Sequence, residues 1–439
     1  MKSVALHNLG CKVNGYEMEV MQQSLQEKDY QIVPFDSKAD IYIVNTCTVT
    51  NMADRKSRQM LHRARRLNPD AVVVAVGCYV QAGREEVIKD QGVDLVIGNN
   101  RKKDLVPILE EYLAGRGDKT LQDTTVIDIG STREYENLQL KRTGGHTRAY
   151  IKIQDGCNQF CSYCIIPHVR GRVRSRSRED VLAEVRGLAG SGYREVVLTG
   201  IHISSYGVDQ GAPGLLSLVK SIHEIDGIER IRVGSLEPRI VTEEFAAELA
   251  RLPGFCPHFH LSLQSGCDST LKRMNRRYTA GEYYEKAELL RSVFGNPAIT
   301  TDVITGFPGE TEEEFEATRA FLEKIKFYEM HVFKYSRRKG TPAAVMENQV
   351  PDDIKTARSN ILLEMGRKFS KEYRGCCIGS EAEVLFEEEK VIDGRTFQVG
   401  HTMQYVKVAR ETDLPLANTI ERVRVTGFLT EDILLAEQG

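Results

Sequence analysis

The sequence predicts an α/β protein in three parts: an N-terminal parallel α/β sheet, a central partial (β/α)6 barrel and a C-terminal small β-barrel. Two patterns support this fold class. Apolar strand segments alternate with helical segments over most of the chain, which is typical of parallel sheets. After residue 375, short alternating runs with a turn at Asp393-Gly394 replace that pattern. The 439 residues exceed one ordinary domain, and we expect parts at 1–115, 143–373 and 376–439, with a linker at 116–142.

The composition narrows the possible classes of function. The net charge is only −3, so a nucleic-acid surface must be a local patch. The first residues lack the apolar core of a signal peptide, and the apolar run 71–76 is too short to span a bilayer. We therefore expect a cytoplasmic protein with no membrane contact. Ten cysteines in that compartment indicate metal or redox chemistry rather than disulfides.

Three cysteines of the first part each follow a predicted strand. The strand segments are 4–9, 41–45, 72–76 and 95–97, and a helical segment follows each. Cys11, Cys47 and Cys78 come directly after the first three. Ligands of open α/β sheets collect outside the carboxyl ends of the strands, so we expect three thiolates to converge on one edge. The alternative is three ordinary buried cysteines, since free cysteine is commonly buried.

A second cysteine group follows the first strand of the predicted barrel. The barrel strands are expected at 149–154, 195–199, 230–233, 260–263, 299–304 and 331–335, with helices between them. Cys157, Cys161 and Cys164 have the spacing C-x3-C-x2-C and lie on the carboxyl-end face, where such barrels bind ligands. Three thiolates can hold an iron–sulfur cluster and leave one iron open. A zinc site is the alternative; it would need a fourth ligand, for which His168 is the nearest candidate.

The other barrel strands end in polar residues and glycine. This set is Gly200, Ser235, Glu237, Gln264, Asp302 and Gly306. Polar side chains at the carboxyl ends of barrel strands favour ligand contacts over a structural role. Glycine allows the backbone to approach a ligand closely. We therefore expect these residues to bind a cofactor near the second cysteine group.

Arginines gather at three places near the expected sites. They are Arg55, Arg58 and Arg63 on the helix after Cys47; Arg170, Arg172, Arg174, Arg176 and Arg178 after Cys164; and Arg338 after the sixth barrel strand. Such runs are often solvated faces, but arginine also forms bidentate contacts with phosphate. Next to metal sites, the arginines favour a polyanionic partner. By contrast, the C-terminal part carries 12 acidic residues against 6 basic ones, which argues against a main phosphate surface there.

Two further expectations concern segments without ligand chemistry. The linker reads as irregular, with one strand at 125–129 and a closing Thr143-Gly144-Gly145 turn. Cys256, Cys267, Cys376 and Cys377 lack cluster spacing, so we expect them to be structural.

Together, the motifs resemble the methylthiotransferase family of radical S-adenosylmethionine (SAM) enzymes. The resemblance covers nearly the whole chain: a domain with three dispersed cysteines, a radical SAM barrel and a TRAM domain. The segments 9–17, 45–50 and 152–158 are similar to the branch that acts on threonylcarbamoyladenosine in tRNA. The segment 333–343 is similar to one that all three branches share, so it does not choose among them. The other branches act on isopentenyladenosine in tRNA and on an aspartate of a ribosomal protein.

The resemblance implies the cofactors and the reaction. Cys157, Cys161 and Cys164 would hold a 4Fe-4S cluster that binds and cleaves SAM, with Tyr163 against the adenine. Cys11, Cys47 and Cys78 would hold an auxiliary 4Fe-4S cluster that carries the sulfur, and a second SAM would supply the methyl group. The clusters would carry the chemistry, with no acid or base residue. Many relatives hold the SAM amino group with Gly-Gly-Glu after the second strand; here 199–202 reads Thr-Gly-Ile-His, and Glu237 is a possible substitute.

The resemblance also implies partners. The substrate would be N(6)-threonylcarbamoyladenosine at position 37, presented by the single-stranded anticodon loop of tRNA. The reaction needs an electron donor such as flavodoxin or ferredoxin, and a sulfur source. A ribosomal protein substrate and a non-catalytic, metal-stabilised RNA-binding module are the competing functions. The basic runs argue against the first, and the polar strand ends argue against the second.

Overall fold

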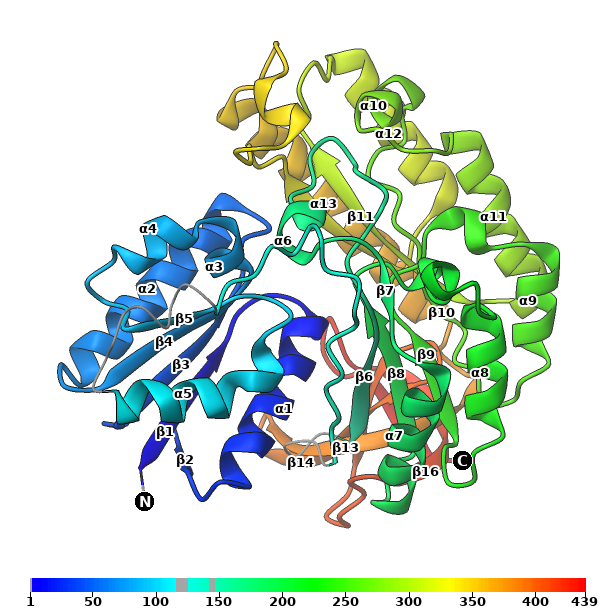
Figure 1. The fold of residues 1–439 in the computed structure, drawn as a ribbon. Coiled ribbons are helices and arrows are strands. Elements are labelled where there is room, and N and C mark those ends of the chain that lie inside the picture. The colour runs from blue at the N-terminus through cyan, green and yellow to red at the C-terminus, as the bar shows by residue number, and fades with distance from the viewer. Residues whose placement is uncertain (1, 116–124, 142–146) are drawn as a thin grey trace.

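The computed structural model describes residues 2–115, 125–141 and 147–439, and it has the predicted α/β fold in three parts (Figure 1). Part of the expected linker and its Thr143-Gly144-Gly145 end lie outside the described residues. The strand predicted at 125–129 is wrong. The Thr125 carbonyl accepts a hydrogen bond from the Gly98 amide, and the Ile127 carbonyl accepts one from the Gln81 side chain. These two bonds do not form the ladder of a strand.

The first part is a five-stranded parallel sheet in the order β2-β1-β3-β4-β5. Its strands are β1 (Ser3–Asn8), β2 (Gln31–Val33), β3 (Ile41–Thr46), β4 (Val72–Gly77) and β5 (Leu95–Ile97). Its helices are α1 (Lys12–Gln26), α2 (Asn51–Leu67), α3 (Cys78–Ala82), α4 (Arg84–Ile88) and α5 (Leu105–Ala114). The central strands β3 and β4 are almost entirely buried, as expected for a sheet with helices on both faces.

The second part is the predicted partial barrel of six parallel strands. They are β6 (Arg148–Asp155), β8 (Glu195–Gly200), β9 (Arg230–Val233), β10 (His258–His260), β11 (Ala298–Thr305) and β12 (Glu329–Lys334). Isolated bridges from Ile231 to Phe255 and from Leu236 to Leu261 connect β9 to the chain around β10. The outer helices are α7 (Arg178–Gly190), α8 (Leu215–His223), α9 (Glu243–Ala250), α11 (Ala280–Phe294) and α12 (Glu312–Ile325). Three short elements were not predicted: α6 (Ile166–Arg170), β7 (Arg174–Ser175) and α10 (Asp268–Arg273).

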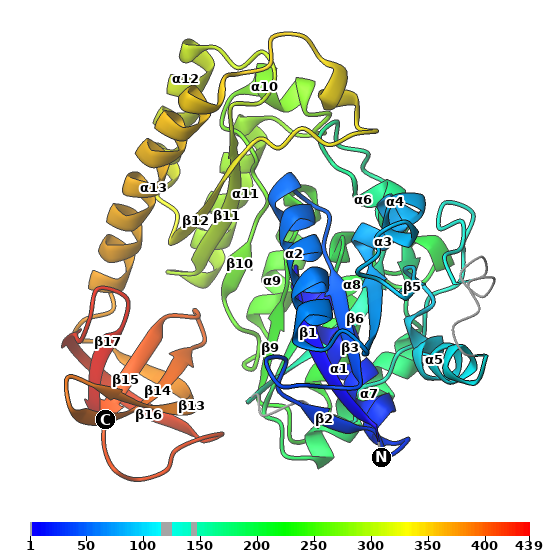
Figure 2. The ribbon, with the colours of Figure 1, turned by 90° about the vertical axis from the view of Figure 1, so that its left-hand side faces the viewer.

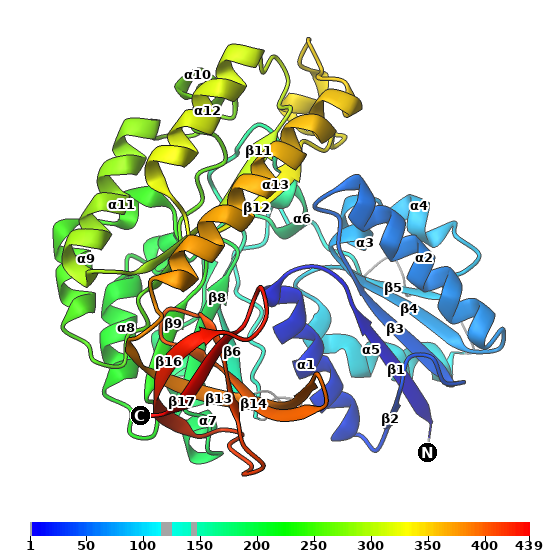
Figure 3. The same cartoon turned by 180° about the vertical axis from the view of Figure 1, so that it is seen from behind.

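The third part is a closed five-stranded barrel, as predicted. Its strands are β13 (Glu381–Ile392), β14 (Arg395–Thr402), β15 (Lys407–Glu411), β16 (Ile420–Phe428) and β17 (Leu434–Gln438). The long helix α13 (Asp352–Gly375) runs along the outside of the large barrel and leads into the small one (Figure 2). The small barrel packs at the amino ends of the large barrel's strands (Figure 3), where Arg230 donates to the carbonyls of His401 and Glu383. No helix in the described ranges is long and apolar enough to cross a membrane.

A buried charge network joins the first part to the second. Glu17 of α1 accepts hydrogen bonds from Lys102 of its own part and, at 2.7 and 2.8 Å, from Lys152 and Arg170 of the barrel. The Glu17 side chain is only 1% exposed. Burial alone would raise the pKa of Glu17, but the positive charges of Arg170, Lys102 and Lys152 outweigh it and hold that pKa well below its ordinary value. This network fixes the carboxyl edge of the N-terminal sheet against the first barrel strand.

Candidate active site

The three N-terminal cysteines converge at the carboxyl edge of the sheet, as predicted. They follow β1, β3 and β4, which are neighbours in the sheet. Two tight turns make room for them. A Cβ atom on Gly10 (φ +106°) would lie 3.1 Å from the Cys47 sulfur, and one on Gly77 (φ +96°) would lie 2.6 Å from an Asn45 side-chain oxygen. Burial raises the pKa of Cys47 to about 11, and Cys78 and Cys11 add to this effect. Such thiols ionise when a metal binds them.

The barrel cysteines lie in a loop that folds back on itself after β6. The Cys157 amide donates to the Gly171 carbonyl at 3.0 Å. Gly156 (φ +70°) has no room for a side chain, because a Cβ there would lie 1.9 Å from the Arg172 carbonyl oxygen. Burial raises the pKa of Cys157 to about 11 and that of Cys164 to about 12, and the neighbouring Cys161 thiol adds to both. All six cysteines are free thiols grouped in threes.

The spacing of the sulfur atoms favours clusters over zinc. Among the described residues, three possible metal ligands have donor atoms that all lie within 4.8 Å of one another: His260, Asp302 and His331. Neither cysteine group is this compact. Sulfurs around tetrahedral zinc, at about 2.3 Å from the metal, lie roughly 3.8 Å apart. An iron–sulfur cluster places several iron atoms between its thiolates. Neither cysteine group therefore has the compact spacing of a tetrahedral zinc site.

The two cysteine groups are neighbours in space. Cys78 packs against Ile165, the residue after Cys164, and against Val169 of the helix α6 that follows. Asn99 bridges the two sides: its side-chain amide donates to the Val169 carbonyl at 2.7 Å and to the Cys78 sulfur at 3.5 Å. Two incomplete metal sites therefore lie on either side of one short segment.

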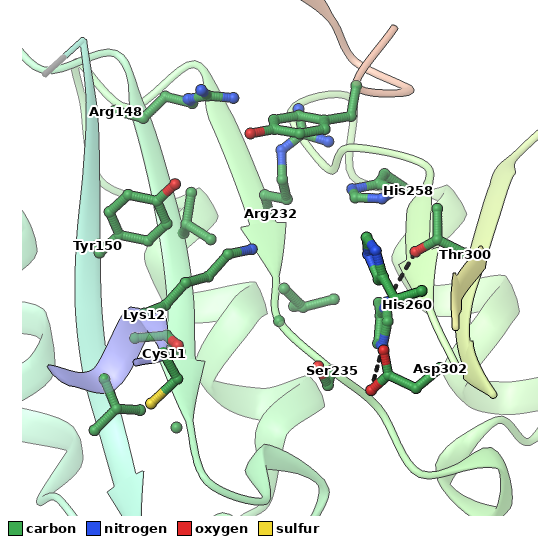
Figure 4. A pocket seen from close by; sticks show the side chains of 18 of the residues that line it. Cys11, Lys12, Arg148, Tyr150, Arg232, Ser235, His258, His260, Thr300 and Asp302 are labelled. Carbon is green, nitrogen blue, oxygen red and sulfur yellow. Dashed lines mark hydrogen bonds and ion pairs between the residues drawn. The ribbon is translucent and has the colours of Figure 1, made fainter. Parts of the chain in front are cut away.

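A cavity of about 440 Å3 opens beside Cys11 inside the large barrel (Figure 4). All three parts of the chain line it: Cys11 and Lys12 come from the first, and Tyr405 comes from the third. The barrel strands supply most of the remaining wall, including Arg148, Tyr150, Gly200, Arg232, Ser235, His258, His260, Asp302, Glu329 and His331. The cavity is large enough for a small organic group, and several charged side chains lie in its wall.

The comparisons with known proteins agree with this arrangement. The sequence matches the Radical SAM superfamily over residues 151–322 and the uncharacterized protein family UPF0004 over residues 3–98. It is 40% identical to the threonylcarbamoyladenosine tRNA methylthiotransferase MtaB of Bacillus subtilis, covering 97% of this chain and 94% of that protein. The chain belongs to the radical SAM methylthiotransferase family. Enzymes of this family are transferases that use SAM and 4Fe-4S clusters.

Two other relatives show the breadth of the resemblance. The tRNA-2-methylthio-N(6)-dimethylallyladenosine synthase of Acetivibrio thermocellus is 35% identical, covering 98% of this chain and 89% of that protein. Among solved structures, the radical SAM methyltransferase TsrM from Kitasatospora setae has a TM-score of 0.57 and 17% identity, and covers 78% of this chain and 74% of that one. The TsrM likeness supports the fold alone.

Three of the residues expected to bind SAM in this methylthiotransferase line the cavity, and the others do not. Gly200, Ser235 and Asp302 line the cavity, and Asp302 lies 3.4 Å from His260. Glu237 is buried and accepts a bond from Arg239 at 2.7 Å. Gly306 packs against α13, where a Cβ would lie 2.2 Å from Lys355. The close packing against α13 explains why residue 306 is a glycine. The expected reason was a close approach of the backbone to a ligand.

Two more of these residues remain: Tyr163, between Cys161 and Cys164 in the chain, and Gln264, which follows β10. Tyr163 packs edge-on against Phe307, with ring centroids 6.5 Å apart. Gln264 has a left-handed backbone conformation (φ +73°), and its backbone N–H donates to the Asp302 carbonyl. Its side chain is 8% exposed. Both stay candidates for SAM contacts.

The prediction that the arginine run binds phosphate is wrong for three of its members. Arg170, Arg174 and Arg176 are at most 1% exposed. Arg170 pairs with Glu17 and Asp155, Arg174 donates to the Arg170 and Arg172 carbonyls, and Arg176 pairs with Glu184. Their charges are neutralised inside the protein and cannot meet RNA. Arg172 and Arg178 stay exposed, and the Arg172 guanidinium lies 4.4 Å from the Phe160 ring centre.

Arg338 is a second correction. It is 7% exposed and binds the first part of the chain, with hydrogen bonds of 2.7 Å to Asp54, 2.6 Å to Asn51 and 2.7 Å to Thr48. It therefore joins two parts of the enzyme rather than presenting a charge to phosphate. The predicted α2 residues Arg55, Arg58 and Arg63 are exposed, although Arg63 pairs with Asp36.

Several site residues were missed by sequence reasoning. Arg276 donates to the Cys161 sulfur at 3.2 Å, and its guanidinium group lies 4.8 Å from the centre of the Tyr278 ring. The cavity residues Lys12, Arg148, Arg232, His258 and Tyr405 were not singled out. A partial signal exists: residues two apart on a strand face the same side, as Arg148 and Tyr150 do on β6. Tyr405 carries no such signal, because it reaches the cavity from another part of the chain.

Proposed function

We propose that this protein is a tRNA methylthiotransferase that converts N(6)-threonylcarbamoyladenosine at position 37 to its 2-methylthio derivative. The observation that carries the proposal is that two free three-cysteine groups lie next to one another, and that one of them reaches the cavity through Cys11. A single radical SAM site needs only one such group. A reaction that both activates a carbon atom and inserts sulfur needs two adjacent sites.

The relatives favour the threonylcarbamoyl branch. Relatives named threonylcarbamoyladenosine tRNA methylthiotransferase are 35–40% identical, against 32–36% for dimethylallyladenosine synthases matched over similar lengths. The cavity supports the same choice. Its wall of lysine, arginine, histidine and carboxylate side chains suits a polar substituent better than the apolar dimethylallyl group.

The two cluster sites have distinct duties in this proposal. With both 4Fe-4S clusters and SAM bound, the cofactors supply the radical that activates carbon 2 of the adenine, the sulfur and the methyl group. Cys157, Cys161 and Cys164 would hold the cluster that binds SAM, and Tyr163 would pack on the SAM adenine. Cys11, Cys47 and Cys78 would hold the cluster next to the substrate. The enclosing wall of the cavity limits the access of water to the reacting base.

The hydrogen bond from Arg276 should tune the barrel cluster. A cationic donor to a ligand sulfur stabilises the more negative, reduced cluster, so Arg276→Gln should lower its midpoint potential by on the order of 60 mV. The measurement is a redox titration followed by electron paramagnetic resonance. Arg277→Gln is the matched control, since its side chain is exposed. Equal potentials in the two variants would remove Arg276 from this role.

The RNA surface is proposed to include exposed arginines of α2 and of the loop after α6: Arg55, Arg58, Arg63 and Arg172. Arg172→Ala should weaken tRNA binding and reduce the slope of log affinity against log salt by about 0.7–0.9, the value for one lost phosphate contact. Arg367→Ala, on the exposed face of α13, is the control. A slope that does not change in the Arg172 variant would contradict the contact.

The remaining partners follow from the proposed chemistry. We expect a small electron donor such as flavodoxin or ferredoxin, and a separate sulfur source. Because the substrate is tRNA, we also propose that the enzyme works in the cytoplasm.

Mass spectrometry of nucleosides tests the function. In cells that lack the gene and have no redundant enzyme, the 2-methylthio derivative of threonylcarbamoyladenosine should disappear while the unmodified precursor accumulates. Loss of the 2-methylthio group from isopentenyladenosine instead would move the enzyme to the other tRNA branch. Unchanged tRNA with a changed ribosomal protein would indicate a protein substrate.

A further inference from the structure

Three cations from two parts of the chain meet at one end of the cavity. Arg148 is the first residue of β6, and Arg232 lies on β9, which is separated from β6 by β8 in the same sheet. Lys12 begins α1 directly after Cys11, and its ammonium group points into the cavity between Tyr150 and Arg232 (Figure 4). The two guanidinium groups are held flat against the Tyr405 ring, at 4.7 and 4.8 Å from its centre.

The counter-charges do not balance this cluster. Arg232 is paired with Glu195 at 2.9 Å, and Arg148 with Glu387 at 3.1 Å. Among the residues that the structure describes, no carboxylate forms an ion pair with Lys12. Its ammonium nitrogen lies 5.8 Å from the centre of the Tyr150 ring. Arg148 also has a buried nitrogen, Nη1, without a hydrogen-bond partner. An unpaired ammonium, beside a guanidinium group that keeps one N–H without a partner, forms a site for an anion.

The position of the three cations along the barrel axis indicates which part of the substrate would reach them. Arg148 opens β6 at its amino end, whereas Gly200 closes β8 at the carboxyl end that carries the barrel cysteines. Both residues line the same cavity. An adenine that reacts near the cysteines would therefore extend a substituent toward Lys12, Arg148 and Arg232.

We propose that Lys12 and the Nη1 group of Arg148 bind the carboxylate of the threonylcarbamoyl substituent, while Tyr405 and Glu387 hold Arg148 in place. This inference rests on the proposed function and deepens it, because it assigns the residues that select an anionic substituent. An apolar substituent would leave the Lys12 charge without a partner in a partly enclosed site, which is unfavourable. Nucleotide phosphate is the other possible source of an anion at this cluster.

The test compares anticodon stem-loops on the holoenzyme with both clusters. The stem-loops carry threonylcarbamoyladenosine, the same base with its carboxylate capped as an amide, or unmodified adenosine at position 37. Fluorescence anisotropy gives the affinity for each. In the wild type, the carboxylate form should bind about tenfold more tightly than the amide form, the range of hydrogen bonds to charged groups.

The variants locate that preference. Lys12→Gln should remove most of the tenfold preference for the carboxylate form, and Lys12→Arg should restore most of it. Lys28→Gln, just past the other end of α1 and exposed, is the matched control and should keep the full preference. Equal losses for all three stem-loops in Lys12→Gln would mean a phosphate contact and would overturn the proposal. So would a wild type that does not distinguish carboxylate from amide, a measurement that needs no variant.

The design separates this inference from the proposed function. If the wild type methylthiolates the threonylcarbamoyl stem-loop but shows no preference for the carboxylate, only the assignment of the cation cluster is wrong. If the wild type does not act on that stem-loop, the proposed substrate is wrong as well.

Discussion

Replacing Cys47 by alanine is expected to remove about half of the bound iron and all methylthio transfer. Two 4Fe-4S clusters hold about eight irons per chain, and a site with two remaining thiols should not keep its cluster. The barrel cysteines are untouched, so reductive cleavage of SAM should continue. Iron analysis after anaerobic reconstitution, together with assays of 5′-deoxyadenosine and of modified RNA, measures all three quantities.

A cysteine far from both sites controls for this change. Cys376 lies at the end of α13 and is exposed. Cys376→Ala should keep about eight irons and full activity. If Cys47→Ala also kept eight irons, Cys47 would not be a ligand and the N-terminal site would have to be assigned differently. Bound zinc in the wild type would contradict both cluster sites.

The second large effect is on stability. Glu17→Gln should destabilise the fold by about 3–5 kcal/mol, because it leaves Lys102, Lys152 and Arg170 buried with one carboxylate fewer. Urea unfolding of the metal-free protein measures the change. Glu27→Gln, near the end of the same helix, breaks an exposed pair with Lys141 and should cost at most about 1 kcal/mol.

The pH dependence of this effect has a definite sign. The pKa of Glu17 is depressed in the folded protein, so the stability from its charge is fully present above its unfolded pKa of about 4.3. It is lost as the pH falls below that value. The difference between wild type and Glu17→Gln should therefore be constant near neutral pH and shrink below about pH 4.3. A difference that grew on acidification would contradict the role of the charge.

The cysteine sites could be predicted because strand order alone brings them together. Cys11, Cys47 and Cys78 follow neighbouring parallel strands, and the carboxyl ends of such strands share an edge whatever the side-chain details. The same reasoning placed Cys157, Cys161 and Cys164 on the open face of the barrel. Backbone topology, which the alternation of strands and helices reveals, was sufficient for both.

The arginine run could not be interpreted in this way, because its meaning depends on distant partners. Glu17 is 153 positions from Arg170 in the chain, yet it accepts its hydrogen bond at 2.8 Å. The pattern Arg-x-Arg shows the charges but not their counter-charges, so a buried network resembles a phosphate surface. Lys12 and Tyr405 were missed for a related reason: their cavity exists only once three parts of the chain have docked.

The most direct measurement of the central claim is a competition between two RNA substrates. The reconstituted holoenzyme, with SAM and a reductant, is given equal amounts of anticodon stem-loops carrying threonylcarbamoyladenosine and isopentenyladenosine at position 37. Mass spectrometry of the digested RNA should detect the 2-methylthio group on threonylcarbamoyladenosine and little on isopentenyladenosine. A 2-methylthio group only on isopentenyladenosine, or on neither RNA, would contradict it.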